Sequence, residues 1–185
     1  MRTSILSFAL FAAAAAPAIA LAGPDRTVVP PTPARLELAV TSSAFVANQP
    51  IPPEFTCDGN DTPPPLSWST VPKDTRSVAI LVEDPDAPKG AFTQWLVTGI
   101  SPIANSISKS TLPEGAMAAK NSKGTTGYAG PCPPSGKHRY YFHVFALDTT
   151  LTAPPADKLA FLSAINGHVL ADGQLMGTYQ KTTTP

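Results

Sequence analysis

The chain has 185 residues, with 13 basic and 13 acidic side chains and therefore no formal net charge at pH 7. A neutral chain lacks the excess of lysine and arginine that nucleic-acid binding uses, so we expect protein or small-molecule partners and no nucleic acid. The 22 prolines argue against long helices through most of the chain, because each removes a backbone hydrogen-bond donor.

The first 22 residues have the features of a secretory signal peptide. Arg2 precedes an alanine-rich apolar run that ends in the small-x-small triplet Ala20-Leu21-Ala22. Cleavage there leaves a leader at residues 23–35, which is rich in proline and poor in large apolar side chains. The alternative is an N-terminal membrane anchor, although Pro17 interrupts the run. We therefore expect a periplasmic or secreted domain over residues 36–185, without a membrane span after signal cleavage.

The two cysteines, Cys57 and Cys132, are an even number in a chain that is expected to be exported. Disulfides persist in oxidising compartments outside the cytosol. We therefore predict a disulfide between these two residues. The alternative of two separately buried thiols stays open here, because pairing depends on a geometry that the sequence does not show.

The periodicity of apolar residues predicts a mainly β protein, an antiparallel β-sandwich. Strands are predicted at residues 36–40, 77–84, 94–100 and 138–148. The unbroken apolar run at 78–82 is typical of a central strand that is covered on both faces. The following side chains are expected to be buried: Val78, Ile80, Val82, Trp95, Phe142 and Val144.

Helices are predicted only near the C-terminus. Residues 156–166 place Leu159, Leu162 and Ile165 at helical spacing, and Asn166-Gly167 can end that helix. A second short helix is predicted at residues 168–177.

The usual signatures of catalytic and phosphate-binding loops are missing, and so are the C-x-x-C and H-E-x-x-H patterns. We therefore favour a protein that is not an enzyme and expect no catalytic residue, cofactor or metal. His138 and His143 are five positions apart in one predicted strand, so they point to opposite faces of the sheet. His143, and likewise His168, are interpreted as structural histidines with one hydrogen-bonded ring nitrogen.

The predicted strand at 77–84 ends in an acidic turn that contains Asp84 and Asp86. Aspartates beside prolines are ordinary turn residues, whose side chains accept hydrogen bonds from the backbone beyond them. Loops at the open end of a sandwich are also where binding groups are found. Both interpretations are kept at this point.

Three segments together resemble the phosphatidylethanolamine-binding protein family, and more narrowly its bacterial Raf-kinase-inhibitor-like branch. They are the acidic motif at 84–88, the segment at 92–95 that ends in Trp95, and the loop and strand at 130–148. The resemblance implies an antiparallel β-sandwich with short C-terminal helices and a small anion-accepting pocket. The pocket residues implied by it are Asp84, Asp86, Pro131, Pro133, His138 and Tyr140.

The chain departs from the family pattern at Gln94, where the family commonly has a histidine before the tryptophan. Glutamine can still donate a hydrogen bond to an anion, but it cannot become cationic. We include Gln94 among the expected ligand-binding residues.

Three functions follow from these observations. The favoured one is a non-enzymatic binding protein for a small anionic ligand or a phosphorylated headgroup. The first alternative is an inhibitor of a protease or of another protein partner. The second is a hydrolase that uses Asp84, Asp86 and His138, but Ser135, in the proline loop, has no evident base beside it.

Overall fold

The computed structural model describes residues 36–108 and 111–181, which form two β-sheets, a short 3₁₀ helix η1 (Pro53–Phe55) and an α-helix α1 (Lys158–Ile165). The large sheet runs in the order β1 (Leu36–Glu37), β9 (Val169–Gln180), β8 (Lys137–Leu147), β4 (Ser77–Asp84), β5 (Phe92–Ile100) and β7 (Met117–Ala118). The small sheet contains β2 (Val40–Thr41), β3 (Leu66–Trp68) and β6 (Ser106–Ile107). The expected signal peptide at 1–22 and leader at 23–35 lie outside the described residues.

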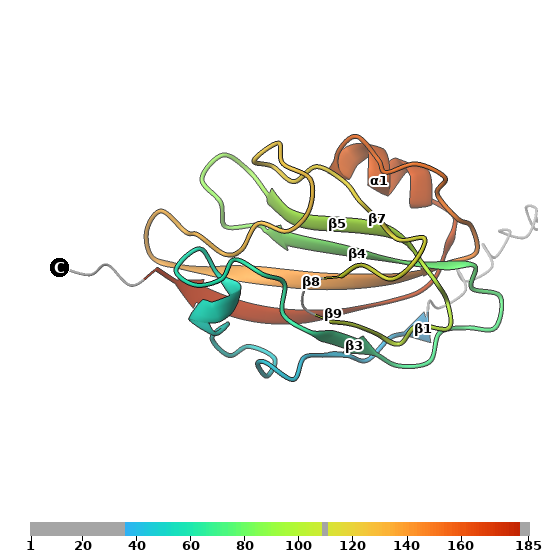
Figure 1. Ribbon diagram of the computed structural model, residues 1–185, viewed down its shortest axis with the longest axis horizontal. Helices are drawn as coiled ribbons and strands as arrows, with labels where there is room; N and C mark the ends of the chain where they lie inside the picture. Colours follow the sequence, from blue (N-terminus) through green and yellow to red (C-terminus); the bar gives the residue numbers. More distant parts are fainter. Residues whose placement is uncertain (1–35, 109–110, 182–185) are drawn as a thin grey trace, which may run out of the picture. The chain divides into compact units, whose positions relative to one another are not determined.

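The predicted antiparallel β-sandwich is confirmed. Figure 1 shows β5, β4, β8 and β9 side by side in the large sheet. The strand pairs of both sheets are antiparallel, except that β1 runs parallel to β9. The six side chains that were predicted to be buried are at most 3% exposed.

Strand β4 has the central position that its apolar run predicts, and its two faces pack against different layers. Val78, Ile80 and Val82 belong to the core that the large sheet shares with Leu66 and Trp68 of the small sheet. The alternate residues Ala79 and Leu81 lie on the opposite face, in a second core with Phe161 and Ile165 of α1. A strand buried on both faces needs apolar side chains at every position, which explains the unbroken run.

Helix α1 forms where the sequence predicts it, but of the three residues at helical spacing only Ile165 is buried, together with Phe161. The Asp157 carboxylate accepts a hydrogen bond from the Ala160 N–H at the start of the helix. Phe161 and Ile165 face the sheet, whereas Leu159 is 76% exposed.

The second helix that was predicted at 168–177 is wrong, because residues 169–177 belong to β9. They pair with β8 in a register that joins Tyr140 to Gly177 and Ala146 to Ala171. Gly173 lies so close to the Leu38 carbonyl oxygen that a Cβ there would come within 1.9 Å of it. This glycine permits a close backbone approach in the strand, while in a helix it would be unfavourable.

The strand predicted at 36–40 is divided between the two sheets. β1 joins the large sheet and β2 joins the small sheet, with the buried Leu38 between them. The segment therefore links the two layers instead of extending one of them. In the described part of the chain, no helix has the length and apolar character needed to cross a membrane.

Candidate functional site

The end of β4 and the start of β8 meet at one end of the large sheet and bring an aspartate and a histidine together. Asp84 Oδ2 lies 2.8 Å from His138 Nδ1, although the residues are 54 positions apart in the chain. Both are buried, with exposed fractions of 3% and 8%. Asp84 Oδ1 also accepts a hydrogen bond of 2.9 Å from the Asp86 N–H, which orders the acidic turn. One carboxylate therefore shapes the turn and orients the imidazole.

Asp86 is bound to a different partner. Its carboxylate accepts hydrogen bonds from Nε of Arg139 at 2.9 Å and from Nη2 of the same guanidinium at 2.6 Å. The hydrogen bond from the guanidinium is the main reason why the pKa of Asp86 is lowered to about 2. This pair fastens the acidic turn to β8 on the exposed side of the strand.

A cavity of about 220 Å³ opens beside the Asp84–His138 pair. It is lined by Asp84, Ala87, Pro88, Phe92, Gln94, Lys123, Gly130, Cys132, Pro134 and His138. Three of the residues expected from the sequence, Asp84, Gln94 and His138, are in its wall.

The proline loop lines the cavity through other residues than expected. Pro131 and Pro133 are buried, whereas the alternate residues Cys132 and Pro134 are exposed and line the cavity. In an extended segment, neighbouring side chains point to opposite sides. Pro131 and Pro133 face the protein interior, so they cannot also face the cavity. Asp86 and Tyr140 are likewise outside the cavity wall.

Tyr140 lies behind the wall, fully buried. Burial and then the negative charge of Asp84 raise the pKa of Tyr140 well above its usual range, so the phenol stays protonated. Within the described residues, Oε1 of the buried Gln94 has no hydrogen-bond partner. Buried polar atoms normally have one, so this oxygen, in a residue that lines the cavity, indicates a ligand-binding site.

Residues that sequence reasoning missed complete the cavity. Ala87, Pro88 and Phe92 form an apolar part of the wall, and Lys123 adds a basic side chain. Ala87 and Pro88 belong to the acidic motif itself, so their position in the sequence could have predicted that they lie in the wall. Lys123 comes from a separate loop with no motif to mark it.

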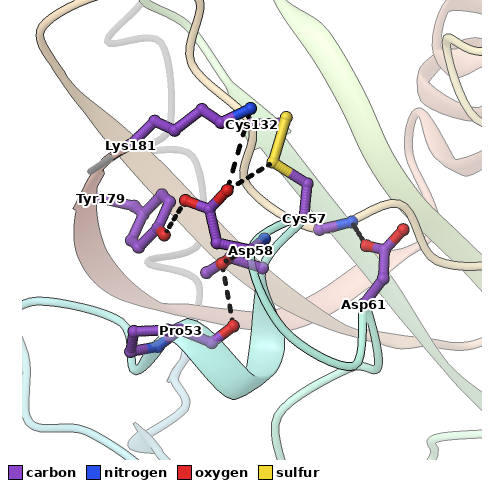
Figure 2. Close-up of a disulfide and its surroundings, with 9 residues drawn as sticks. Pro53, Cys57, Asp58, Asp61, Cys132, Tyr179 and Lys181 are labelled. Atoms are coloured by element: carbon purple, nitrogen blue, oxygen red, sulfur yellow. Dashed lines mark hydrogen bonds and ion pairs between the residues drawn. A yellow bond between two sulfur atoms is a disulfide. The ribbon is translucent and has the colours of Figure 1, made fainter. Parts of the chain in front are cut away.

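The predicted disulfide between Cys57 and Cys132 is present, with the two Cα atoms 5.4 Å apart. It joins the loop after η1 to the proline loop, and Figure 2 shows its surroundings. The same loops are joined by a hydrogen bond from the Cys57 N–H to the Pro131 carbonyl at 3.1 Å and by one from the Gly130 N–H to the Asp61 carboxylate at 2.5 Å. The cavity wall at Cys132 is therefore held by covalent and non-covalent links together.

Asp58, next to Cys57, connects this loop to the end of β9. Its carboxylate accepts a hydrogen bond of 2.5 Å from the Tyr179 hydroxyl and lies 3.8 Å from Nζ of Lys181. Figure 2 shows Asp58 between these two side chains. The loop after η1 is thus tied to β9 as well as to the proline loop.

In each of the other two histidines, one ring nitrogen lies close to a carboxylate. His143 Nε2 lies 3.4 Å from Glu83 on the opposite face of the sheet, and His168 Nδ1 lies 2.8 Å from Asp148. Over residues 36–108 and 111–181, no group of three or more His, Cys, Asp or Glu side chains is arranged to hold a metal ion.

Comparison with known proteins identifies the group to which the chain belongs. The family model described as phosphatidylethanolamine-binding protein matches residues 41–180. The chain belongs to the phosphatidylethanolamine-binding protein family. The match spans β3 to β9 and so includes the cavity and the disulfide of this family member.

Three proteins illustrate how similar the family members are. A Methanothermobacter thermautotrophicus protein named UPF0098 is 44% identical over 71% of this chain and 91% of its own length. LppC of Mycobacterium tuberculosis, which carries a lipoprotein name, is 38% identical over 81% of this chain and 76% of its own. The solved structure of the homologue CT736 from Chlamydia trachomatis matches with a TM-score of 0.75 and 38% identity, covering 79% of this chain and 99% of that one.

Proposed function

We propose that this chain is a non-enzymatic, periplasmic or secreted binding protein whose cavity accepts a small anionic group, such as a phosphate or a carboxylate. The observation that carries the proposal is the buried Asp84–His138 pair in the wall of the cavity. Buried ionisable pairs in a cleft are typical of binding and catalytic sites.

The pair defines what the cavity offers to a ligand. The Asp84 carboxylate can only accept, so His138 Nδ1 carries a proton and Nε2 is the nitrogen left for the ligand. In the neutral imidazole Nε2 is an acceptor, and in the imidazolium it is a charged donor. An anion can therefore be bound by the imidazolium form of His138, in which Nε2 donates.

Two further features support a binding site. Oε1 of Gln94 is buried without a protein partner among the described residues, and the amide of Gln94 can hydrogen-bond a ligand in either orientation. The proline loop is held by the disulfide and by hydrogen bonds, so little ordering is needed when a ligand binds.

The hydrolase alternative needs Asp84 and Asp86 to act on one substrate. The Asp86 carboxylate is occupied by Arg139 instead, outside the cavity wall. Ser135 is exposed on the proline loop, and no hydrogen bond of its hydroxyl to a base is seen in the described part of the chain. These positions favour binding over hydrolysis.

Export is supported by the signal-like N-terminus and by the disulfide, which would not persist in a reducing cytosol. The lipoprotein name of LppC agrees with a family member outside the cytosol.

Isothermal titration with phosphoethanolamine, inorganic phosphate and acetate tests the proposal. We expect at least one of the three probes to bind, with the imidazole of His138 as a charged donor. The His138→Gln variant, which keeps a neutral donor, should lose at least about 10-fold in affinity. The His168→Gln variant is the matched control, since His168 lies beyond the opposite end of β8.

If the wild-type protein binds none of the three probes, the proposal is contradicted and the alternative of a protein partner is favoured. Equal affinities for the His138→Gln and His168→Gln variants would remove His138 from the site.

A further inference from the structure

Lys123 is presented to the cavity by a tightly bonded turn. The Asn121 carbonyl accepts a hydrogen bond of 2.8 Å from the Gly124 N–H, and Asn121 Oδ1 accepts one of 2.9 Å from the Lys123 N–H. Asn121 Nδ2 donates to the Gly127 carbonyl at 3.0 Å. Asn121 is only 5% exposed, so this turn is anchored by a buried side chain.

The turn is also fixed to the strand that carries Gln94. The Ser122 N–H donates to the Thr93 carbonyl, and the Thr93 N–H donates to Ser122 Oγ, both at 2.9 Å. Thr93 lies between Phe92 and Gln94, two residues of the cavity wall. The Lys123 backbone is therefore held beside the part of β5 that lines the cavity.

The polar and charged side chains of the cavity wall differ in whether they have an ion-pair partner. Asp84 is engaged by His138, and Gln94 is neutral. Of the ion pairs that the described residues form, none includes Lys123. Lys123 is an exposed residue of the cavity wall, so its ammonium group is available to a ligand.

We propose that Lys123 is a binding residue that supplies a second cationic contact, which Gln94 cannot supply, and that it makes the site prefer phosphomonoesters to phosphodiesters. This inference rests on the proposed function of the cavity. A phosphomonoester carries a charge of about −1.5 to −2 near neutral pH, whereas a diester carries about −1. Attraction to an added positive group grows with the charge of the ligand, so Lys123 favours the monoester.

The two ligand classes correspond to two sources of the same phosphate chemistry. Phosphoethanolamine represents a free monoester, and glycerophosphoethanolamine represents the diester headgroup of an intact lipid. Titrating both into the same protein separates these sources.

The experiment compares wild-type protein with the variants Lys123→Gln, Lys123→Arg and Lys73→Gln by isothermal titration at about pH 7. Lys73 is an exposed lysine before β4, at the end of that strand opposite to Asp84, so its loss changes the net charge equally. Thermal unfolding monitored by circular dichroism checks that all variants are folded.

We expect the Lys123→Gln variant to bind phosphoethanolamine about 5-fold more weakly and glycerophosphoethanolamine about 2-fold more weakly, since a rim charge in water contributes modestly. Lys123→Arg and Lys73→Gln should stay close to wild type. Raising the salt from about 50 mM to about 500 mM should reduce the difference between wild type and Lys123→Gln, because salt screens the exposed charge.

The outcomes separate the two proposals. If wild-type protein binds phosphoethanolamine and the Lys123→Gln and Lys73→Gln variants bind it equally well, or equally poorly, Lys123 has no specific role and the anion site stands. If wild-type protein binds the diester as tightly as the monoester, the preference is wrong. If it binds neither ligand, the anion site itself is contradicted, and Lys123 with it.

Discussion

At the scale of single residues, the cavity depends on how its polar groups are paired. The Asp84 carboxylate bonds both His138 and the backbone of its own turn, whereas Gln94 has a buried oxygen without a protein partner among the described residues. Gln94 is thus the wall residue whose replacement tests the site most directly. It occupies the position where the resemblance implies a histidine.

We predict that Gln94→His strengthens the binding of phosphoethanolamine at low pH. A cationic imidazole donor is stronger than a neutral amide, and we expect a gain of about 5-fold, or about 1 kcal/mol. The gain should shrink above about pH 6.5, the ordinary pKa of histidine. Titration calorimetry of both proteins at low and high pH measures it, with circular dichroism as the folding control. Equal affinity at low pH would show that position 94 does not contact the anion.

At the scale of elements, α1 is attached to the large sheet by apolar contacts and by an ion pair. Phe161 and Ile165 pack on the sheet, and Lys158 pairs with Glu83 of β4. The hydrogen bond from His143, followed by the contact with Lys158, lowers the pKa of Glu83 to about 2 from 4.5. A carboxylate with a lowered pKa stabilises the folded state above its unfolded pKa, and this contribution is lost as the pH falls.

We predict that Glu83 adds about 1–2 kcal/mol to the free energy of unfolding near neutral pH, a value reduced from the full pKa shift because solvent screens part of the pair. The contribution should be complete above pH 4.5 and disappear between pH 4.5 and about 2. Urea unfolding of wild type and Glu83→Gln across this range measures it, with the exposed Glu114→Gln as control. A constant difference between wild type and Glu83→Gln down to pH 2 would contradict this assignment.

Sequence patterns predicted the elements in which buried side chains recur at a regular spacing along the chain. The apolar run of β4 and the aromatic alternation of β8 reflect directly which faces are covered. β9 was misjudged because its glycines serve contacts with a distant segment, such as that of Gly173 with the Leu38 carbonyl. Contacts of this kind override local propensity and leave no periodic signal.

The candidate site was predictable only in part for a similar reason. Asp84 and His138 stand at strand ends, and the family resemblance implies that they share one pocket. Lys123 reaches the cavity through hydrogen bonds between Ser122 and Thr93, 29 positions apart, and no local pattern marks such a contact. Which residues of the proline loop line the cavity also depends on the side of the loop that packs inward. The residue types alone do not determine that side.

At the scale of the whole described domain, the disulfide closes a loop between residues that are 75 positions apart. We predict that the Cys57→Ser, Cys132→Ser double variant is less stable by roughly 4 kcal/mol in the chain-entropy account, because the unlinked chain gains freedom when it unfolds. Denaturant unfolding measures this difference. Phosphoethanolamine affinity should change by less than about 3-fold, which is about 0.7 kcal/mol, since hydrogen bonds still join the two loops.

Intact mass after alkylation without reductant provides the direct check on the native protein. No alkylated cysteine is expected. Two labelled thiols would contradict the bridge, and a collapse of ligand affinity in the double variant would show that the bridge, not the hydrogen bonds, shapes the cavity.

The parallel pairing of β1 with β9 determines where the cavity lies relative to a surface to which the folded domain is attached. Leu36 lies beside Ala171, whereas the residue paired with His138 is Tyr179, eight positions further along β9 and about 25 Å away. In Figure 1, β1 lies at the end of the large sheet where β9 begins. A surface linkage on the Leu36 side therefore leaves the cavity residues at the end of the sheet away from the support. A linkage after Gln180, which pairs with Lys137, would attach the domain by the end that carries the cavity.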